Sequence, residues 1–205
     1  MILVTAFGPY QHHRMNASGV LVESLRRELP DELAGLRDRL AFEVLRCEEI
    51  SRESEHQSLE AQLAELLVRH RPTVCIHTGQ APAFNKVTIE KIAINSFLNE
   101  IIDPDLPAAY WSTLPGADAL RDVLEREHIP ADYSFYCGQH QCNHILFSSL
   151  HFAKTNANAH QAGFIHIPLL PEQVTQDNRD APYMPLEMSR KALALVIRHV
   201  AEALG

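Results

Sequence analysis

The sequence has no long hydrophobic run and no cluster of basic residues. None of its apolar stretches reaches the roughly 18 continuous residues that a membrane-spanning helix needs. The apolar run at residues 2–7 has no basic segment before it, so it lacks the pattern of a signal peptide. With a formal net charge of -8, the chain offers no basic surface for nucleic acid. We expect a protein that binds neither a membrane nor nucleic acid.

Several familiar ligand-binding motifs are also missing. The chain contains neither GxxxxGK[ST] nor GxGxxG, the glycine-rich loops that hold nucleotide phosphates. It has no HExxH, no zinc-type spacing of Cys and His, and no EF-hand pattern. The segment 162–166 contains no GxSxG elbow, so a serine hydrolase is not supported. We expect a protein without a metal ion or a cofactor.

The chain also has no CxxC pair. Its thiols are those of Cys47, Cys75, Cys137 and Cys142, which stand mostly in apolar surroundings. Free thiols in a reducing compartment explain this pattern most simply, because disulfide frameworks belong to oxidising environments. We therefore expect a cytoplasmic protein.

What the chain does contain is an alternation of short apolar runs with amphipathic segments. Strands are expected at residues 2–7, 41–47, 73–77, 87–95, 133–136 and 163–168. Helices are expected at residues 17–29, 54–70, 117–128, from about 142 onward, and 187–203. Residues 96–116 are expected to form an ordered excursion with little regular structure. The pattern predicts a single α/β domain over residues 1–205, a three-layer α/β/α sandwich around a mainly parallel twisted sheet.

In sheets of this kind ligands bind beyond the carboxyl ends of the strands. Three features stand at or near such ends. Gly79-Gln80 follows the strand at residues 73–77, Cys142 follows the strand near 133–136, and His166 lies in the last predicted strand. We expect the functional site where these segments meet.

Cys142 is a candidate nucleophile because a helix is predicted to begin beside it. A thiol at a helix N-terminus faces unpaired backbone N–H groups and the positive end of the helix dipole. Both favour the thiolate, which is the reactive form. The structural alternative is a small apolar side chain that fills a strand-to-helix corner.

His166 and Glu90 are the candidate partners of that thiol. A cysteine nucleophile needs a base within hydrogen-bond reach and a third group that orients the base. His166 stands alone in an apolar strand, where a core histidine is the alternative interpretation. Glu90 is flanked by isoleucines, and a buried carboxylate needs a partner because an unpaired one is costly.

Several segments, in the same order along the chain, resemble the motifs of pyroglutamyl peptidase I, the pyrrolidone-carboxylate peptidases. The resemblance extends over the whole chain, and the joint match is more specific than any one segment. The segments are Thr5–Tyr10 with Asn16, Gly79–Pro82, Val87–Asn95, Ser112–Pro115, Cys142–His144, and His166–Pro168 with Pro171–Gln173.

The resemblance implies a cysteine aminopeptidase that removes an N-terminal 5-oxoproline residue through a thioester intermediate. By position, it implies Cys142 as the nucleophile, His166 as the general base and Glu90 as the carboxylate that supports the histidine. Phe7 and Tyr10 are the candidates for the walls around the ring of the substrate, with Gln80 as a polar contact. The expected partner is a peptide with a blocked N-terminus, and the resemblance also suggests a homo-oligomer, often a tetramer.

The chain departs from the family pattern around the expected pocket. Cys137 and His140 stand where the family usually has a small residue and an aromatic one, and Pro82–Phe84 replace a segment that tends to carry glycines and an arginine. Two other functions therefore stay open. One is a cysteine amidase that acts on a different small acyl amide. The other is a non-catalytic binding protein of the same fold, in which the Cys142 thiol is merely buried.

Overall fold

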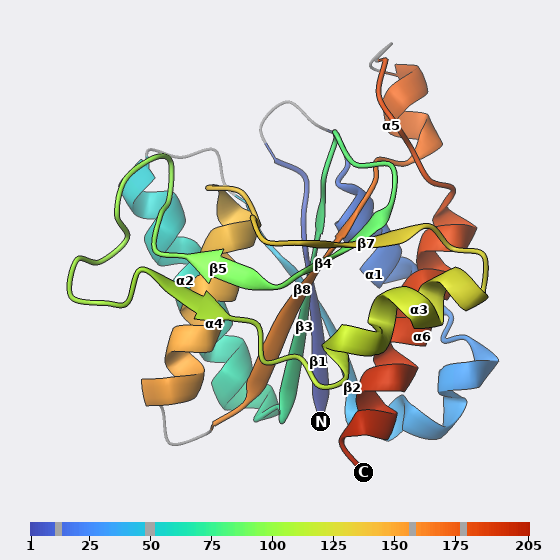
Figure 1. Cartoon of the computed structure of the whole chain (residues 1–205), viewed down its shortest axis with the longest axis horizontal. Coiled ribbons are helices and arrows are strands. Elements are labelled where there is room, and N and C mark those ends of the chain that lie inside the picture. Colours follow the sequence, from blue (N-terminus) through green and yellow to red (C-terminus); the bar gives the residue numbers. More distant parts are fainter. Residues whose placement is uncertain (11–13, 48–51, 156–158, 177–179) are drawn as a thin grey trace.

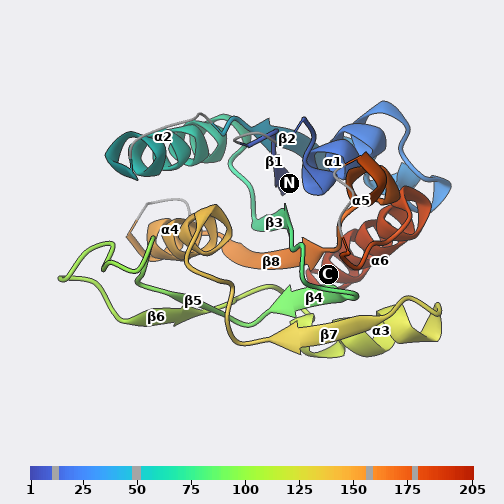
Figure 2. The same cartoon turned by 90° about the horizontal axis from the view of Figure 1, so that it is seen from above.

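Six strands form the central sheet, in the order β2-β1-β3-β8-β4-β7 (Figures 1 and 2). The computed structural model describes residues 1–10, 14–47, 52–155, 159–176 and 180–205. The strands of this sheet are β1 (Ile2–Phe7), β2 (Leu40–Leu45), β3 (Val74–Gln80), β4 (Val87–Glu90), β7 (Ala131–Ser134) and β8 (Gln161–Ile167). All neighbouring strands run parallel except β4 and β8, which are antiparallel. The prediction of a mainly parallel sheet is confirmed.

Helices cover both faces of this sheet, which confirms the three predicted layers. Figure 2 shows α2 and α4 on one side of the sheet and α1 and α6 on the other. The helices are α1 (Ala17–Arg27), α2 (Arg52–His70), α3 (Leu120–Arg126), α4 (Gln141–Thr155), α5 (Pro171–Gln176) and α6 (Leu186–Ala203), with the 3-10 helices η1 (Asp31–Arg39) and η2 (Ala117–Ala119). The sequence patterns predicted neither η1 nor α5.

Two apolar cores result, because successive side chains of a strand point to opposite faces. In β1, Ile2 and Val4 pack in the core under α1 and α6, whereas Leu3 and Phe7 pack in the core under α2 and α4. β8 divides in the same way, with Ile165 in the first core and Phe164 in the second. The strand that carries His166 is therefore held from both sides.

The predicted strand at residues 87–95 is wrong in one respect, since it is broken after Glu90. Residues Ile92–Ile94 form β5, which pairs with β6 (Ala109–Trp111) in a separate antiparallel sheet. β5 does not extend the central sheet, and its Ala93 is buried in the core beside α4. The excursion at residues 96–116 accordingly contains one strand that the sequence did not predict.

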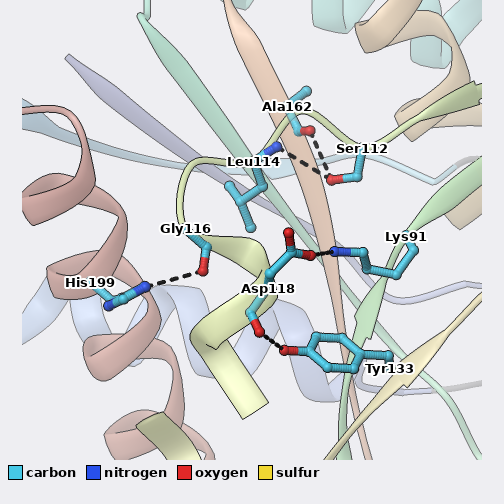
Figure 3. Close-up of polar contacts among 8 residues, drawn as sticks. All are labelled: Lys91, Ser112, Leu114, Gly116, Asp118, Tyr133, Ala162 and His199. Atoms are coloured by element: carbon cyan, nitrogen blue, oxygen red, sulfur yellow. Dashed lines mark hydrogen bonds and ion pairs between the residues drawn. The ribbon is translucent and has the colours of Figure 1, made fainter. Parts of the chain in front are cut away.

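The segment Ser112–Pro115 is hydrogen-bonded to the beginning of β8 (Figure 3). The backbone N–H of Thr113 donates to the carbonyl oxygen of Ala162 at 2.9 Å, and the Thr113 hydroxyl accepts from the N–H of Ala162 at 2.9 Å. Leu114 packs directly over Gly163, where an added Cβ would stand 2.5 Å from the Leu114 Cβ. This motif therefore holds β8 at the end opposite to His166.

Candidate active site

Cys142 is the second residue of α4, as the sequence predicted to within one residue. The helix is 15 residues long, so its unpaired N–H groups and the positive end of its dipole lie at this thiol. The Cys142 side chain is half-buried and lines a pocket. Both features suit a reactive thiolate.

Gly79 makes room for the sulfur of Cys142. A Cβ added to this glycine would stand 2.8 Å from the Cys142 sulfur and 2.7 Å from the Phe164 ring, closer than real Cβ contacts. The sulfur can therefore rest against β3 only because residue 79 has no side chain. The sequence places Gly79 at the expected site but after the predicted strand, whereas the structure places it inside β3, where a glycine permits such a close approach.

His166 and Glu90 meet across the one antiparallel pair of the central sheet. Thr88 lies opposite His166, and Glu90 lies opposite Phe164, so the carboxylate reaches the imidazole diagonally. The Nδ1 atom of His166 donates to the Glu90 Oε1 atom at 2.7 Å. Glu90 is fully buried, which makes the histidine the partner that its carboxylate requires.

The same imidazole also contacts the thiol. His166 shares a side-chain hydrogen bond with Cys142. Because Nδ1 is bonded to Glu90, the other ring nitrogen, Nε2, is left for the sulfur. Phe164 and Phe84 flank the ring, with centroids 4.7 Å and 5.8 Å from that of His166. The structure thus brings together all three residues that the sequence offered as a catalytic set.

The pKa of His166 is raised from 6.5 to about 9. Burial alone would lower it, but the charge of Cys142, the hydrogen bonds to Cys142 and Glu90, and the charge of Glu90 together outweigh the cost of burial. At neutral pH the imidazole is therefore protonated, and it lies between the side chains of Glu90 and Cys142.

A pocket of about 520 Å³ opens over the sulfur of Cys142. Its walls come from the ends of β1 and β3, the loop before β4, and the segment that leads into α4. The lining residues are Phe7, Tyr10, Asn16, Gln80–Phe84, Tyr136–Cys142 and His166. The pocket is of the size that encloses a small ligand.

Phe7, Tyr10 and Gln80 all line this pocket, as predicted from the sequence. The side chain of Gln80 is partly committed to the protein itself. Its Oε1 atom accepts from the N–H of Ala17 at 2.9 Å and from the side-chain amide of Gln173 at 2.9 Å. Gln80 therefore has its amide nitrogen left to serve a ligand, and Gln173 is a positioning residue for it.

Asn143, the residue after Cys142, is fully buried, and its side chain forms hydrogen bonds with the backbone of β5 and of Ser96. Its Oδ1 atom accepts from the N–H of Ile94 at 2.9 Å, and its Nδ2 atom donates to the carbonyl oxygens of Ile94 and Ser96, both at 2.8 Å. These three bonds fix the first turn of α4 against the excursion. Asn143 is therefore a positioning residue for Cys142, and no local sequence pattern indicates this contact.

Cys137 lies beside the histidine and the carboxylate. Its sulfur, one ring nitrogen of His166 and one carboxylate oxygen of Glu90 are all within 4.8 Å of one another. Burial, together with the charges of Glu90 and Cys142, raises the pKa of the Cys137 thiol well above its usual value. The two thiols of the pocket thus differ in character, because the Cys137 thiol is buried beside the Glu90 carboxylate, which disfavours its ionised form.

The arrangement can perform nucleophilic acyl transfer. A thiolate at a helix N-terminus, an imidazole bonded to it and a carboxylate that fixes the imidazole are the parts that such chemistry uses. Fold and site together indicate a hydrolase with a cysteine nucleophile, built on a mainly parallel α/β sheet.

Comparison with known proteins narrows this class. Residues 1–203 match the family model described as pyroglutamyl peptidase. The pyrrolidone-carboxylate peptidase of Thermococcus kodakarensis is 33% identical over 215 residues, which cover 99% of this chain and 97% of the relative. Pyrrolidone-carboxylate peptidase 1 of Caldanaerobacter subterraneus subsp. tengcongensis is 30% identical over 217 residues, which cover 100% of this chain and 99% of the relative.

Solved structures agree with the sequence relatives. A mutant pyrrolidone carboxyl peptidase from Pyrococcus furiosus superimposes with a TM-score of 0.86 at 27% identity, covering 100% of this chain and 99% of that one. Pyroglutamyl peptidase I of Bacillus amyloliquefaciens gives a TM-score of 0.82 at 28% identity, covering 98% and 96%. The chain belongs to the pyroglutamyl peptidase family.

Proposed function

We propose that this protein is a pyroglutamyl peptidase, a cysteine aminopeptidase that hydrolyses the peptide bond after an N-terminal 5-oxoproline residue. The observation that carries the proposal is the position of the His166 ring. It is bonded to Glu90 on one side and to Cys142 on the other, at the base of a pocket. Membership of the family and the names of the relatives supply the substrate class.

In the proposed reaction the Cys142 thiolate attacks the carbonyl carbon of the scissile peptide bond. Backbone N–H groups at the N-terminus of α4 donate to the oxyanion that forms. The His166 imidazolium then gives its Nε2 proton to the leaving amine, and the C–N bond breaks to leave a thioester. Water, deprotonated by the now neutral His166, attacks the thioester, and the acid leaves as the thiolate forms again. Glu90 holds the imidazole in one orientation throughout.

The substrate ring is compact and uncharged, so its binding needs apolar walls and a few amide contacts. Phe7 and Tyr10 supply the walls in this proposal, and the amide nitrogen of Gln80 donates to the ring carbonyl. A free N-terminus would bring an ammonium group into this pocket. Desolvating that charge without a partner is costly, which explains a preference for blocked N-termini.

A direct assay separates this function from the two alternatives. The purified protein is expected to release the chromophore from a pyroglutamyl amide and to leave the corresponding glutaminyl amide intact. Faster cleavage of the glutaminyl amide would instead favour a cysteine amidase. No cleavage of either amide, together with no preferential alkylation of Cys142 by iodoacetamide, would favour a binding protein.

The nucleophile is tested by a conservative substitution. Cys142→Ser is expected to abolish turnover, because an alcohol is a much weaker acid than a thiol and a far poorer nucleophile. The circular dichroism spectrum and the melting temperature should stay close to those of the unmodified protein. Cys47→Ser, which changes a half-buried thiol outside the pocket lining, serves as the matched control. Residual turnover in Cys142→Ser comparable to that of the control would refute the assignment.

We also propose that residues 1–205 form one domain that works as a cytoplasmic homo-oligomer, a tetramer by resemblance. The strands of the central sheet come from segments between residue 2 and residue 167, and this shared sheet supports a single domain. Among the described residues, none of the helices has the length and apolar character to cross a membrane. Ile101, Trp111 and Phe135 are exposed on or beside the excursion, a surface suited to contacts between copies. Light scattering on the purified protein tests the oligomeric state.

A further inference from the structure

A cluster of three side chains that could bind a metal ion overlaps the proposed catalytic residues. Glu90, Cys137 and His166 each offer one ligand atom, and these three atoms lie within 4.8 Å of one another. The three side chains come from β4, from the segment before α4 and from β8. All three are buried, with relative exposures of 0%, 4% and 6%. Carboxylate, thiolate and imidazole are the donors that a zinc ion prefers.

Only one of the two carboxylate oxygens of Glu90 has a hydrogen-bond partner among the described residues. Its Oε1 atom accepts from His166, whereas its Oε2 atom is buried and has no hydrogen-bond partner among the described residues. A buried carboxylate oxygen without a partner is costly, because it has lost its water and gained nothing in return. The unpaired oxygen therefore marks a point where a cation would be stabilised, and the sulfur of Cys137 lies close to this carboxylate.

We propose that Glu90, Cys137 and His166 form a zinc site, and that zinc bound there reversibly blocks the catalytic histidine. Zinc–ligand lengths of about 2.0–2.3 Å place the donors of a tetrahedral site roughly 3.3–3.8 Å apart. The three atoms lie within 4.8 Å of one another, and side-chain rotations bring them to this spacing. The fourth position faces the pocket, which Cys137 and His166 both line and which gives the ion its path of entry.

Binding of zinc is incompatible with turnover. The metal takes the thiolate of Cys137 and a neutral nitrogen of His166, so the thiol proton and the imidazolium proton leave to solvent. A metal-bound imidazole cannot hold its bond to Glu90 and pass a proton to the leaving amine. The inhibitory part of this inference rests on the proposed function, whereas the binding part does not.

Three variants decide where the metal binds. Cys137→Ala removes one proposed ligand, and Cys142→Ala removes the nucleophile, which is not a ligand in this site. Cys47→Ala removes a half-buried thiol outside the pocket lining and is the matched control. Zinc affinity is measured on each full-length protein by competition with a chromogenic chelator. Cobalt(II) then replaces zinc, and its near-ultraviolet thiolate charge-transfer band reports a metal–sulfur bond without reference to activity.

The unmodified protein, Cys142→Ala and Cys47→Ala are expected to bind one zinc ion per chain and to show the cobalt band. Cys137→Ala should bind zinc at least about tenfold more weakly and lose the band. In the assay, zinc should inhibit the unmodified protein and Cys47→Ala, with full recovery on addition of EDTA. The zinc concentration for half inhibition should rise by at least about tenfold in Cys137→Ala, each variant being compared with its own metal-free rate.

Two outcomes would overturn the inference. If Cys142→Ala loses the metal while Cys137→Ala keeps it, the ion bridges the nucleophile and the histidine instead. If no variant binds zinc, the site does not exist, whatever the activity. A protein that binds zinc through Cys137 but cleaves no pyroglutamyl amide would refute the proposed function and leave the metal site standing. Cys137→Ser, which keeps the size of the side chain, replaces Cys137→Ala if the latter misfolds.

Discussion

The two faces of the central sheet differ in what they bury. The face under α1 and α6 packs mainly aliphatic side chains from β1, β3, β4 and β8. The face under α2 and α4 also buries ionisable groups, among them His77, Glu90 and His166. Alternation along a strand places these two environments on neighbouring residues, so Ile165 belongs to the first and His166 to the second.

This difference between the two faces separates the residues that mainly stabilise the fold from the residues that are used in the reaction. Apolar burial stabilises the fold wherever it occurs, and each buried aliphatic side chain contributes about 1.5–3 kcal/mol. Buried ionisable groups cost stability unless they are paired, so their presence on one face indicates a use beyond folding. Substitutions on the α4 face should therefore change the rate, and substitutions on the α1 face should change the free energy of unfolding.

The largest effect is expected on the α4 face from Glu90→Gln. The amide can still accept from His166, but the negative charge that helps to raise the histidine pKa is gone. We expect kcat/KM to fall on the order of 10³-fold. In the unmodified protein kcat/KM should decline as pH rises through about 9, where the imidazolium loses its proton. In the variant this decline should begin at lower pH.

A matched control for this substitution is Glu43→Gln. The Glu43 carboxylate also pairs with a histidine, His70, at 2.8 Å, but far from the pocket lining. It should leave both the rate and the pH profile unchanged. If the decline of kcat/KM at high pH occurs at the same pH in Glu90→Gln as in the unmodified protein, the carboxylate does not raise the pKa of His166.

The next largest effect is expected from Gly79→Ala on the same face. The new methyl group would collide with the Cys142 sulfur and the Phe164 ring, so one of them must move. A misplaced sulfur should lower kcat/KM on the order of 100-fold, and overpacking should cost about 1–3 kcal/mol of stability. Gly35→Ala is the control, because a Cβ there has no neighbour within 4 Å. Full activity in Gly79→Ala would show that the site adapts to the added group.

The smallest effect is expected on the α1 face from Ile165→Val, one residue away from His166. Removing one buried methylene should lower the free energy of unfolding by about 0.5–1.5 kcal/mol, measured by urea denaturation. The rate should be unchanged, because the side chain points away from the pocket. A tenfold loss of kcat/KM with normal stability would break the separation of the two faces.

The secondary structure could be predicted where hydrophobic patterns are long and regular. The strand at residues 2–7 and the helix at residues 187–203 match β1 and α6 to within one residue. Prediction failed at Lys91, where the register of the alternating pattern is blurred and the strand leaves the sheet. The pattern of residues 92–94 is equally satisfied by burial against α4, and the local sequence does not record which apolar surface it will cover.

The candidate site could be predicted in its members but not in its geometry. Cys142 carries a local signal, because helix starts are readable from the sequence. The pairing of Glu90 with His166 depends on the antiparallel register of β4 on β8, in a sheet that was expected to be mainly parallel. In the sequence, Cys137 stands out only as a free thiol and as a departure from the family pattern. Its closeness to Glu90 depends on the path of the segment that leads into α4.

By itself the sequence determined the order of strands and helices, the two apolar faces of each strand and the placement of a thiol at a helix start. These properties depend on residues that are close together in the chain. Only the tertiary structure decided that residues 137, 142 and 166 line one pocket, with residues 79 and 90 packed directly behind them. Contacts between distant segments depend on strand order, direction and register, which the packing of the whole core selects and no local pattern encodes.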